Sequence, residues 1–204
     1  MTIGVGGSTA SIELDKIQDM TANVQPIALA EYKQRIQKAV ILMKEQNCKA
    51  IYLNAGTNLY YFTGTKWNAS ERMVGALLFE DESIQYIVPK FEDGTFKKFM
   101  LVEGALNCWE EHESPSALLG SLVKKKNITH VNIAIDESAA YFLVDGVVKA
   151  NPNYTFVNAQ PITAGCRMQK SANEIEIIQQ AKEITMVVQK AAARILHPGI
   201  EVNT

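Results

Sequence analysis

The sequence is poor in the residues from which thiol, metal and disulfide sites are built. Of its 204 residues only three are cysteines and three are histidines. The cysteines, Cys48, Cys108 and Cys166, are an odd number at wide spacing, and no C-x-x-C pair is present. Disulfide-framed secreted domains usually have even numbers of closely spaced cysteines. We therefore expect reduced thiols, each small and semi-buried, in a cytoplasmic protein.

The sequence also lacks an excess of charge of either sign and any long apolar run. Its formal net charge is −2, and its one notable basic run, Lys124 to Lys126, follows an apolar segment and is typical of a helix end. No apolar run approaches the ~20 residues that span a bilayer, and the N-terminus has no secretory pattern. We expect neither a nucleic acid nor a membrane as partner.

Catalytic motifs are missing as well. His112 is followed by Glu113, but Ser116 stands where H-E-x-x-H requires a second histidine. His130 precedes a strand pattern and His197 lies at a helix end, where a cation suits the helix dipole. No G-x-S-x-G occurs, and the glycine-rich start fails as a phosphate loop because Thr9 replaces its last glycine. The residues predict no catalytic group and no metal site within this chain.

What the sequence does have is a regular alternation of helix and strand patterns. Apolar residues recur at three- and four-residue spacing in the expected helices, which are 29–47, 91–101, 114–127 and 136–150. Short apolar runs bounded by turn residues predict strands at 50–53, 74–79, 84–88, 107–110, 131–135 and 155–157. This alternation, with one hairpin, predicts an α/β fold: a three-layer domain with a mixed central sheet and flanking helices.

Residues 50–75 are the stretch around which this domain is expected to be organised. The segment 58–64 is rich in aromatics and is expected to be a further strand. A polar loop follows it, carries Trp67 and ends at Arg72. Loops held by rigid strands often carry binding groups, but spacing alone favours a surface loop in which Trp67 folds back on the core.

The C-terminal part differs in character. Ser171 and Glu174 have the spacing of a capping box. Apolar residues then keep helical phase from Ile175 to Ile195, which predicts a helix of about 25 residues, well above the mean of ~11. Its apolar stripe needs a partner, and Pro198-Gly199 is typical of a turn between elements. We expect that the chain is cut at the start of a further domain, rather than that the helix packs on a second copy.

These patterns divide the chain into four parts. Residues 1–27 are expected to be an N-terminal arm, with Ile12, Leu14 and Ile17 available for docking. Residues 28–160 are the α/β domain, 161–170 a linker, and 171–204 the long helix that begins the next domain.

Two blocks together resemble a known group of enzymes. The segment 58–64, followed by Arg72 and a hairpin, resembles the N-terminal domain of the creatinase, prolidase and Xaa-Pro aminopeptidase group. The segment 167–171 through Glu174, then Ala181 and the Pro198-Gly199 turn, resembles the junction between that domain and the pita-bread catalytic domain. The resemblance covers about residues 31–199. It implies a substrate-gating and dimerisation domain of a metal-dependent Xaa-Pro aminopeptidase or dipeptidase.

The resemblance also implies cofactors and partners. Such enzymes hold two divalent metal ions, Mn, Zn or Co, on two Asp, one His and two Glu that all follow the junction helix. None can be matched here, so the chain alone is expected to be inactive. The implied partners are its own catalytic domain, a second copy in a homodimer, and a proline-containing peptide as substrate. Two other functions stay open: a stand-alone binding or oligomerisation domain, and the N-terminal domain of a creatinase-like C–N amidinohydrolase.

Arg72 and Trp67 are the candidate substrate-binding residues. In creatine amidinohydrolases an arginine shortly after the aromatic turn faces the substrate of the neighbouring subunit, and Arg72 occupies the matching place. By this resemblance Arg72 would bind a substrate carboxylate or peptide carbonyl, and Trp67 would line the same mouth. The alternative is that Arg72 pairs with an acidic neighbour such as Glu71 or Glu80.

Overall fold

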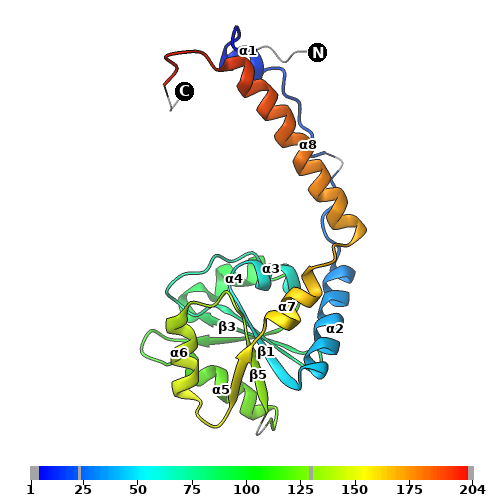
Figure 1. Ribbon diagram of the computed structural model, residues 1–204. Helices are drawn as coiled ribbons and strands as arrows, with labels where there is room; N and C mark the ends of the chain where they lie inside the picture. Colours follow the sequence, from blue (N-terminus) through cyan, green and yellow to red (C-terminus); the bar gives the residue numbers. More distant parts are fainter. Residues whose placement is uncertain (1–4, 23, 129–130, 202–204) are drawn as a thin grey trace. The chain divides into compact units, whose positions relative to one another are not determined.

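The structure is a computed structural model that describes residues 5–22, 24–128 and 131–201. Its contacts divide the chain into two compact units. The first to be described is Ala28–Gln169, and the second combines Met1–Ile27 with Lys170–Thr204. Figure 1 shows the sheet and most of the helices in the unit 28–169.

The unit 28–169 is built on a mixed sheet, as the sequence predicts. Within the described residues six strands follow the order β4-β3-β2-β1-β5-β6. Their bounds are Cys48–Asn54 (β1), Gly75–Phe79 (β2), Ile84–Pro89 (β3), Ala105–Trp109 (β4), Asn132–Ile135 (β5) and Thr155–Asn158 (β6). β2 runs antiparallel to both β1 and β3, while the pairs β3/β4, β1/β5 and β5/β6 are parallel. The carboxyl ends of β1, β5 and β6 therefore lie at the same edge of the sheet.

Helices cover both faces of this sheet. They are α2 (Leu29–Glu45), α3 (Thr57–Thr63), α4 (Asp93–Phe99), α5 (Pro115–Lys125), α6 (Tyr141–Ala150) and α7 (Gln160–Arg167), with the 3-10 turn η1 (Lys90–Glu92) before α4. Ala50 and Tyr52 of β1 belong to the core cluster that also contains Leu119 of α5 and Val147 of α6. Successive strand residues point to opposite faces, so buried Ile51 faces the other layer, where α2 contacts β1 and α7. The three-layer prediction is confirmed.

Several element ends follow from the local chemistry that the sequence predicts. Ser114 caps α5 by accepting a hydrogen bond from the Ala117 backbone N–H at 3.2 Å, and Pro115 occupies the first turn. After α2, Asn47 adopts a left-handed φ of 53°, as expected for a helix stop. The hairpin of β2 and β3 also forms where the sequence predicts it.

The prediction of a strand at 58–64 is wrong, because this segment forms helix α3. Gly56 stands at its N-cap with a φ of 122°, and Gly64 ends it with a φ of 68°. Leu59, Phe62 and Thr63 are buried at helical spacing. The two glycine caps and the three- and four-residue spacing outweigh the β propensity of the aromatic residues.

The predicted start of α6 is also wrong. The helix begins at Tyr141 rather than Asp136. Asp136 instead forms a turn before the helix, in which its side chain accepts a hydrogen bond from the Ser138 backbone N–H. In this helix Tyr141 and Phe142 are 81% and 54% exposed, while Val147 is buried. In α4, Gly94 lies within the helix and does not interrupt it.

Most of the segment expected to be a linker is helical. Residues 160–167 form α7, whose Ile162, Thr163 and Cys166 are buried. This helix packs against α2 and so belongs to the unit 28–169. The division of the chain into domains stays a prediction.

The second unit contains α1 (Ala10–Leu14) and α8 (Ala172–Ile195). The predicted capping box starts α8: the Glu174 backbone N–H donates to Ser171 Oγ at 3.1 Å, and the Ser171 backbone N–H donates to Glu174 Oε2 at 2.8 Å. Ile12 and Leu14 are exposed, whereas Glu13 is buried.

Polar contacts fasten the arm to α8. Arg194 Nη1 lies 3.1 Å from Glu13 Oε2, and Lys16 Nζ lies 2.8 Å from Glu13 Oε1. The hydrogen bond from Lys16, together with those from Ser8 and Arg194, lowers the pKa of Glu13 from 4.5 to about 2. Gln180 Nε2 also donates to the Met20 carbonyl at 2.7 Å. These polar contacts hold the arm on α8, while of the apolar docking candidates Ile12 and Leu14 are exposed and Ile17 is half-buried.

No helix in the ranges that the structure describes combines the length and apolar character needed to cross a bilayer.

Candidate functional site

The loop that carries Trp67 and Arg72 is anchored in the core at both ends. At its start the Thr65 backbone N–H donates to the buried Thr63 hydroxyl at 3.2 Å. At its end the Met73 carbonyl accepts a hydrogen bond from Trp109 Nε1 at 3.1 Å. Both hydrogen bonds join buried residues, so the two ends of the loop are held in place by the core.

Arg72 is engaged by acidic neighbours. Its Nε lies 3.0 Å from Glu111 Oε1, its Nη1 pairs with Glu71, and its guanidinium lies 5.3 Å from the centre of the Phe91 ring. The hydrogen bond with Glu111 raises the pKa of Arg72. Glu80, the other expected neighbour, instead pairs with Lys49 at 2.7 Å. A carboxylate ligand of Arg72 would therefore bind through Nη2 or compete with Glu111 and Glu71 for the other two nitrogens.

Trp67 packs back on the domain, as spacing alone indicates. Its ring centre lies 5.3 Å from that of buried Phe96 and 6.3 Å from that of Phe99. It also lines a hollow of about 330 Å³, together with Gly56, Thr57, Tyr60, Lys66 and Asn68. Arg72 is not among the residues that line this hollow. The loop thus carries both candidate residues, but the structure does not bring them into one hollow.

A buried polar network that sequence reasoning missed joins the carboxyl ends of β1 and β5. Asp136, immediately after β5, is 1% exposed. Its Oδ2 accepts the Asn54 backbone N–H at 3.0 Å, and its Oδ1 accepts Asn58 Nδ2 at 2.9 Å. Oδ1 also accepts the backbone N–H and the hydroxyl of Ser138 at 2.8 and 2.7 Å. An Asp two residues before a Ser, directly after a strand, is the signal that could have indicated this turn.

The network continues through Asn58 to α7. Asn58 Nδ2 also donates to Glu137 Oε1 at 3.1 Å, and Asn58 Oδ1 accepts from Arg167 Nη1 at 2.9 Å. The Thr163 hydroxyl donates to Glu137 Oε2 at 2.9 Å. Because both Asp136 oxygens and the Asn58 amide already have partners, this network fixes α3 and α7 against the sheet rather than offering groups to a ligand.

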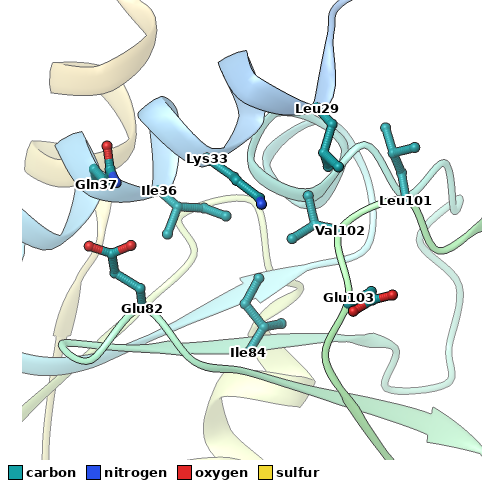
Figure 2. A pocket seen from close by; sticks show the side chains of 9 residues that line it. All are labelled: Leu29, Lys33, Ile36, Gln37, Glu82, Ile84, Leu101, Val102 and Glu103. Atoms are coloured by element: carbon teal, nitrogen blue, oxygen red, sulfur yellow. The ribbon is translucent and has the colours of Figure 1, made fainter.

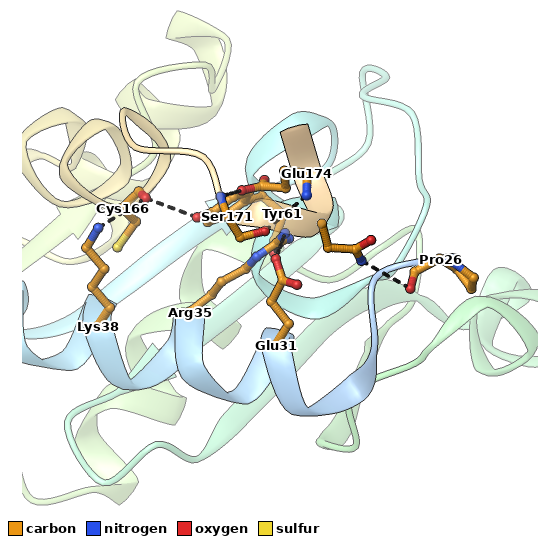
Figure 3. Close-up of polar contacts among 9 residues, drawn as sticks. Pro26, Glu31, Arg35, Lys38, Tyr61, Cys166, Ser171 and Glu174 are labelled. Carbon is orange, nitrogen blue, oxygen red and sulfur yellow. Dashed lines mark hydrogen bonds and ion pairs between the residues drawn. The ribbon is translucent and has the colours of Figure 1, made fainter. Parts of the chain in front are cut away.

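A second set of contacts fastens α2 to α3 and α7 (Figure 3). Arg35 Nη1 donates to the Tyr61 carbonyl at 2.9 Å, and Arg35 Nη2 pairs with Glu31 at 2.7 Å. The Tyr61 hydroxyl donates to the Cys166 carbonyl at 3.0 Å, and Lys38 Nζ donates to the same oxygen at 3.4 Å. These contacts hold the helical layer that supports the start of the Trp67 loop.

The thiols are poorly suited to nucleophilic catalysis. Burial raises the pKa of all three cysteines, in the case of Cys166 to about 11. Nucleophilic cysteines have lowered pKa values, since the thiolate is the reactive form. The three cysteines are free in the structure, and Cys48 and Cys166 are buried.

Metal ligands do not converge in the described part of the chain. There, no group of three or more His, Cys, Asp and Glu residues is placed to hold a metal ion. His112 and His197 are within this part, whereas His130 lies outside the described residues. The residues described therefore do not fit a two-metal centre.

A family model identifies the domain. Residues 35–169 match the model of the creatinase/prolidase N-terminal domain. Since the match covers more than half of the chain, the chain belongs to this family. The resemblance stated from the sequence is confirmed.

The curated relatives that this chain matches are longer proteins. The chain is 26% identical over 171 residues to "Putative dipeptidase YkvY" of Bacillus subtilis, covering 83% of this chain and 44% of that protein. It is 23% identical over 184 residues to an uncharacterized peptidase of Schizosaccharomyces pombe, covering 83% of this chain and 39% of that protein. The chain thus spans less than half the length of the curated relatives it matches.

Solved structures show the same fold. A recombinant prolidase from Thermococcus sibiricus superposes with a TM-score of 0.69 at 20% identity, over 79% of this chain and 42% of that one. The N-terminal domain of an Xaa-Pro dipeptidase from Lactobacillus brevis superposes with a TM-score of 0.56 at 17% identity, over 68% of this chain and 98% of that one.

Proposed function

We propose that this chain is the N-terminal, substrate-gating and dimerisation domain of a metal-dependent Xaa-Pro dipeptidase or aminopeptidase. The observation that carries the proposal is the family match over residues 35–169. Similarity to longer chains named dipeptidase or prolidase supports it. In the complete protein the reaction would be hydrolysis of the peptide bond before proline.

The chemistry would belong to a catalytic domain that this chain contacts. Two divalent ions, Mn, Zn or Co, would there activate the water that attacks the peptide bond. The residues described here do not form such a centre, so we expect no hydrolysis by the 204-residue chain alone. Its own contribution would be to shape the entrance to the site and to hold two copies together.

Gating would rest on Trp67 and Arg72. Trp67 is backed by Phe96, which is itself fully buried, so the indole has a rigid support on one side. Beside it, Tyr60 is half exposed and Lys66 is exposed. A hollow with aromatic walls and a cation is suited to the ring and the carboxylate of a proline-containing peptide.

Replacing Trp67 by alanine in the complete protein is expected to raise KM for an Xaa-Pro dipeptide about fivefold or more, with a smaller change in kcat. The reason is that an aromatic contact surface would be lost from the entrance, not from the metal centre. Steady-state kinetics measures this. Trp67→Phe is the matched control, because it retains a ring against Phe96 and should stay close to the parent.

The outcome of the Trp67 experiment also separates the alternatives. Unchanged KM and kcat for Trp67→Ala would contradict the gating role. Cleavage of creatine but not of Xaa-Pro peptides by the parent protein would assign the domain to a creatinase-like amidinohydrolase instead. Sedimentation of the complete protein as a monomer would contradict dimerisation.

A further inference from the structure

A second hollow, of about 530 Å³, lies between α2, the turn that joins β2 to β3, and the segment before β4 (Figure 2). Neither Trp67 nor Arg72 lines it, so the proposed gating role does not use it. Its volume is in the range of sites that hold small ligands, roughly 300–1,000 Å³. All of its lining residues belong to the unit 28–169.

The walls of this hollow are apolar. Ile36, Ile84 and Val102 are 4%, 5% and 7% exposed, and Figure 2 shows these three side chains directed toward the same space. Leu29 and Leu101 stand at its border and are 44% and 46% exposed. A branched aliphatic group could therefore be buried on all sides except the opening.

Three charged residues stand around these walls: Lys33, Glu82 and Glu103. Figure 2 shows Lys33 extending from α2 toward Val102, while the Glu82 carboxylate rises from the hairpin turn toward α2. Among the described residues Lys33 forms no ion pair with any carboxylate within 4.0 Å. One cation and two anions thus border an apolar hollow without neutralising one another.

Glu82 occupies a backbone position that favours glycine. Its φ is 63°, in the left-handed region, where a side chain is sterically unfavourable. The turn around it is closed by the Glu82 backbone N–H donating to the Phe79 carbonyl at 3.0 Å. In hairpin loops of this kind the left-handed residue is usually glycine. The backbone conformation at position 82 therefore favours glycine, yet the residue there carries a carboxylate.

We propose that this hollow binds a free α-amino acid with an apolar side chain. The ligand carboxylate pairs with Lys33, its ammonium group with one of the two carboxylates, Glu82 or Glu103, and its side chain packs on Ile36, Ile84 and Val102. Because Lys33, Glu82 and Glu103 are all exposed, each pairing is weak. A ligand of this size then binds with a Kd on the order of 1 mM. The inference does not depend on the proposed peptidase function.

The test is an NMR titration of the ¹⁵N-labelled chain with three compounds of the same carbon skeleton: L-leucine, leucinol, which lacks the carboxylate, and 4-methylpentanoate, which lacks the ammonium group. L-Leucine is expected to give saturable shifts at the amides of Lys33, Ile84 and Val102. Each of the other two compounds should bind about fivefold more weakly, as expected for loss of one partly exposed ion pair.

Two variants tie these preferences to named residues. In Lys33→Met the difference between leucine and leucinol should disappear. In Glu82→Gly with Glu103→Gln the difference between leucine and 4-methylpentanoate should disappear. Glycine accepts the left-handed backbone at position 82, so this variant is expected to fold and to melt at the same temperature as the parent or higher. Lys44→Met, at an exposed lysine of α2 outside the hollow, is the matched control and should bind as the parent does.

Three results would overturn the inference. The first is the absence of saturable shifts with L-leucine at concentrations well above roughly 1 mM. The second is equal binding of all three compounds, which would show that the charges play no part. The third is a Lys33→Met variant that still prefers leucine to leucinol as strongly as the parent.

Discussion

Replacing Asp136 by alanine is expected to lower the free energy of unfolding of the unit 28–169 by about 3–4 kcal/mol. The carboxylate accepts hydrogen bonds from the Asn54 backbone N–H and from Asn58 Nδ2, and both donors belong to buried residues. Without it, the Asn54 backbone N–H and one of the two N–H groups of Asn58 Nδ2 would be buried and unsatisfied, at a cost of about 1–3 kcal/mol apiece. Two contacts with Ser138 would be lost as well.

Urea unfolding followed by tryptophan fluorescence measures this effect, since Trp67 and Trp109 both lie in this unit. Asp145→Ala is the matched control, because Asp145 forms an exposed pair with Lys149 on the surface of α6. Such a pair contributes little, so its loss should change stability by less than about 0.5 kcal/mol. Equal effects of the two substitutions would show that the network does not hold the sheet edge together.

Replacing Arg72 by alanine in the complete protein is expected to lower kcat/KM for Xaa-Pro peptides about 10- to 100-fold. The reason is the loss of a charge-assisted contact with a substrate carboxylate or carbonyl. Glu111 and Glu71 occupy the guanidinium in this structure. The substrate must therefore bind through Nη2 or compete with these carboxylates, so the expected effect is smaller than for an arginine without acidic neighbours.

Two further variants separate substrate binding from a structural role of Arg72. Arg72→Lys keeps the charge but not the planar fork, so it should restore only part of the activity. Glu111→Ala frees Nε of the guanidinium and should leave kcat/KM unchanged or higher. If Arg72 merely holds the loop through Glu111, then Arg72→Ala and Glu111→Ala will lower kcat/KM and thermal stability together.

The sequence predicts the elements whose signals are local. Ser114-Pro115 marks the start of α5, Asn47 the end of α2, and Ser171 with Glu174 the start of α8. In each case the capping group and the helix lie within a few residues, so no tertiary information is needed.

The secondary-structure predictions are wrong where contacts with residues distant in sequence determine the local structure. Residues 58–64 have strand-like composition, but α3 forms because Gly56 and Gly64 bracket it and because Asn58 is held by Asp136, far along the chain. Asp136 itself looks like a helix start until its partners Asn54 and Asn58 are known. Propensity is easily overridden by such tertiary contacts.

Arg72 and Trp67 could be named as candidate substrate-binding residues only from the resemblance to the creatinase and prolidase group. Arg72 and Trp67 are ordinary loop residues by spacing, and the structure gives each a partner within its own domain, Glu111 and Phe96. The hollow bordered by Lys33 and Glu82 brings together α2 and a hairpin turn that are far apart in sequence. No local pattern indicates such a site.

The measurement that tests the account most directly is the hydrolysis of an Xaa-Pro dipeptide by the complete natural gene product, with and without Mn²⁺. The account predicts Mn²⁺-dependent release of proline by that protein, loss of activity on chelation, and none by the 204-residue chain alone. The absence of cleavage of any Xaa-Pro peptide with Mn²⁺, Zn²⁺ or Co²⁺ would contradict it. So would hydrolysis by the 204-residue chain itself.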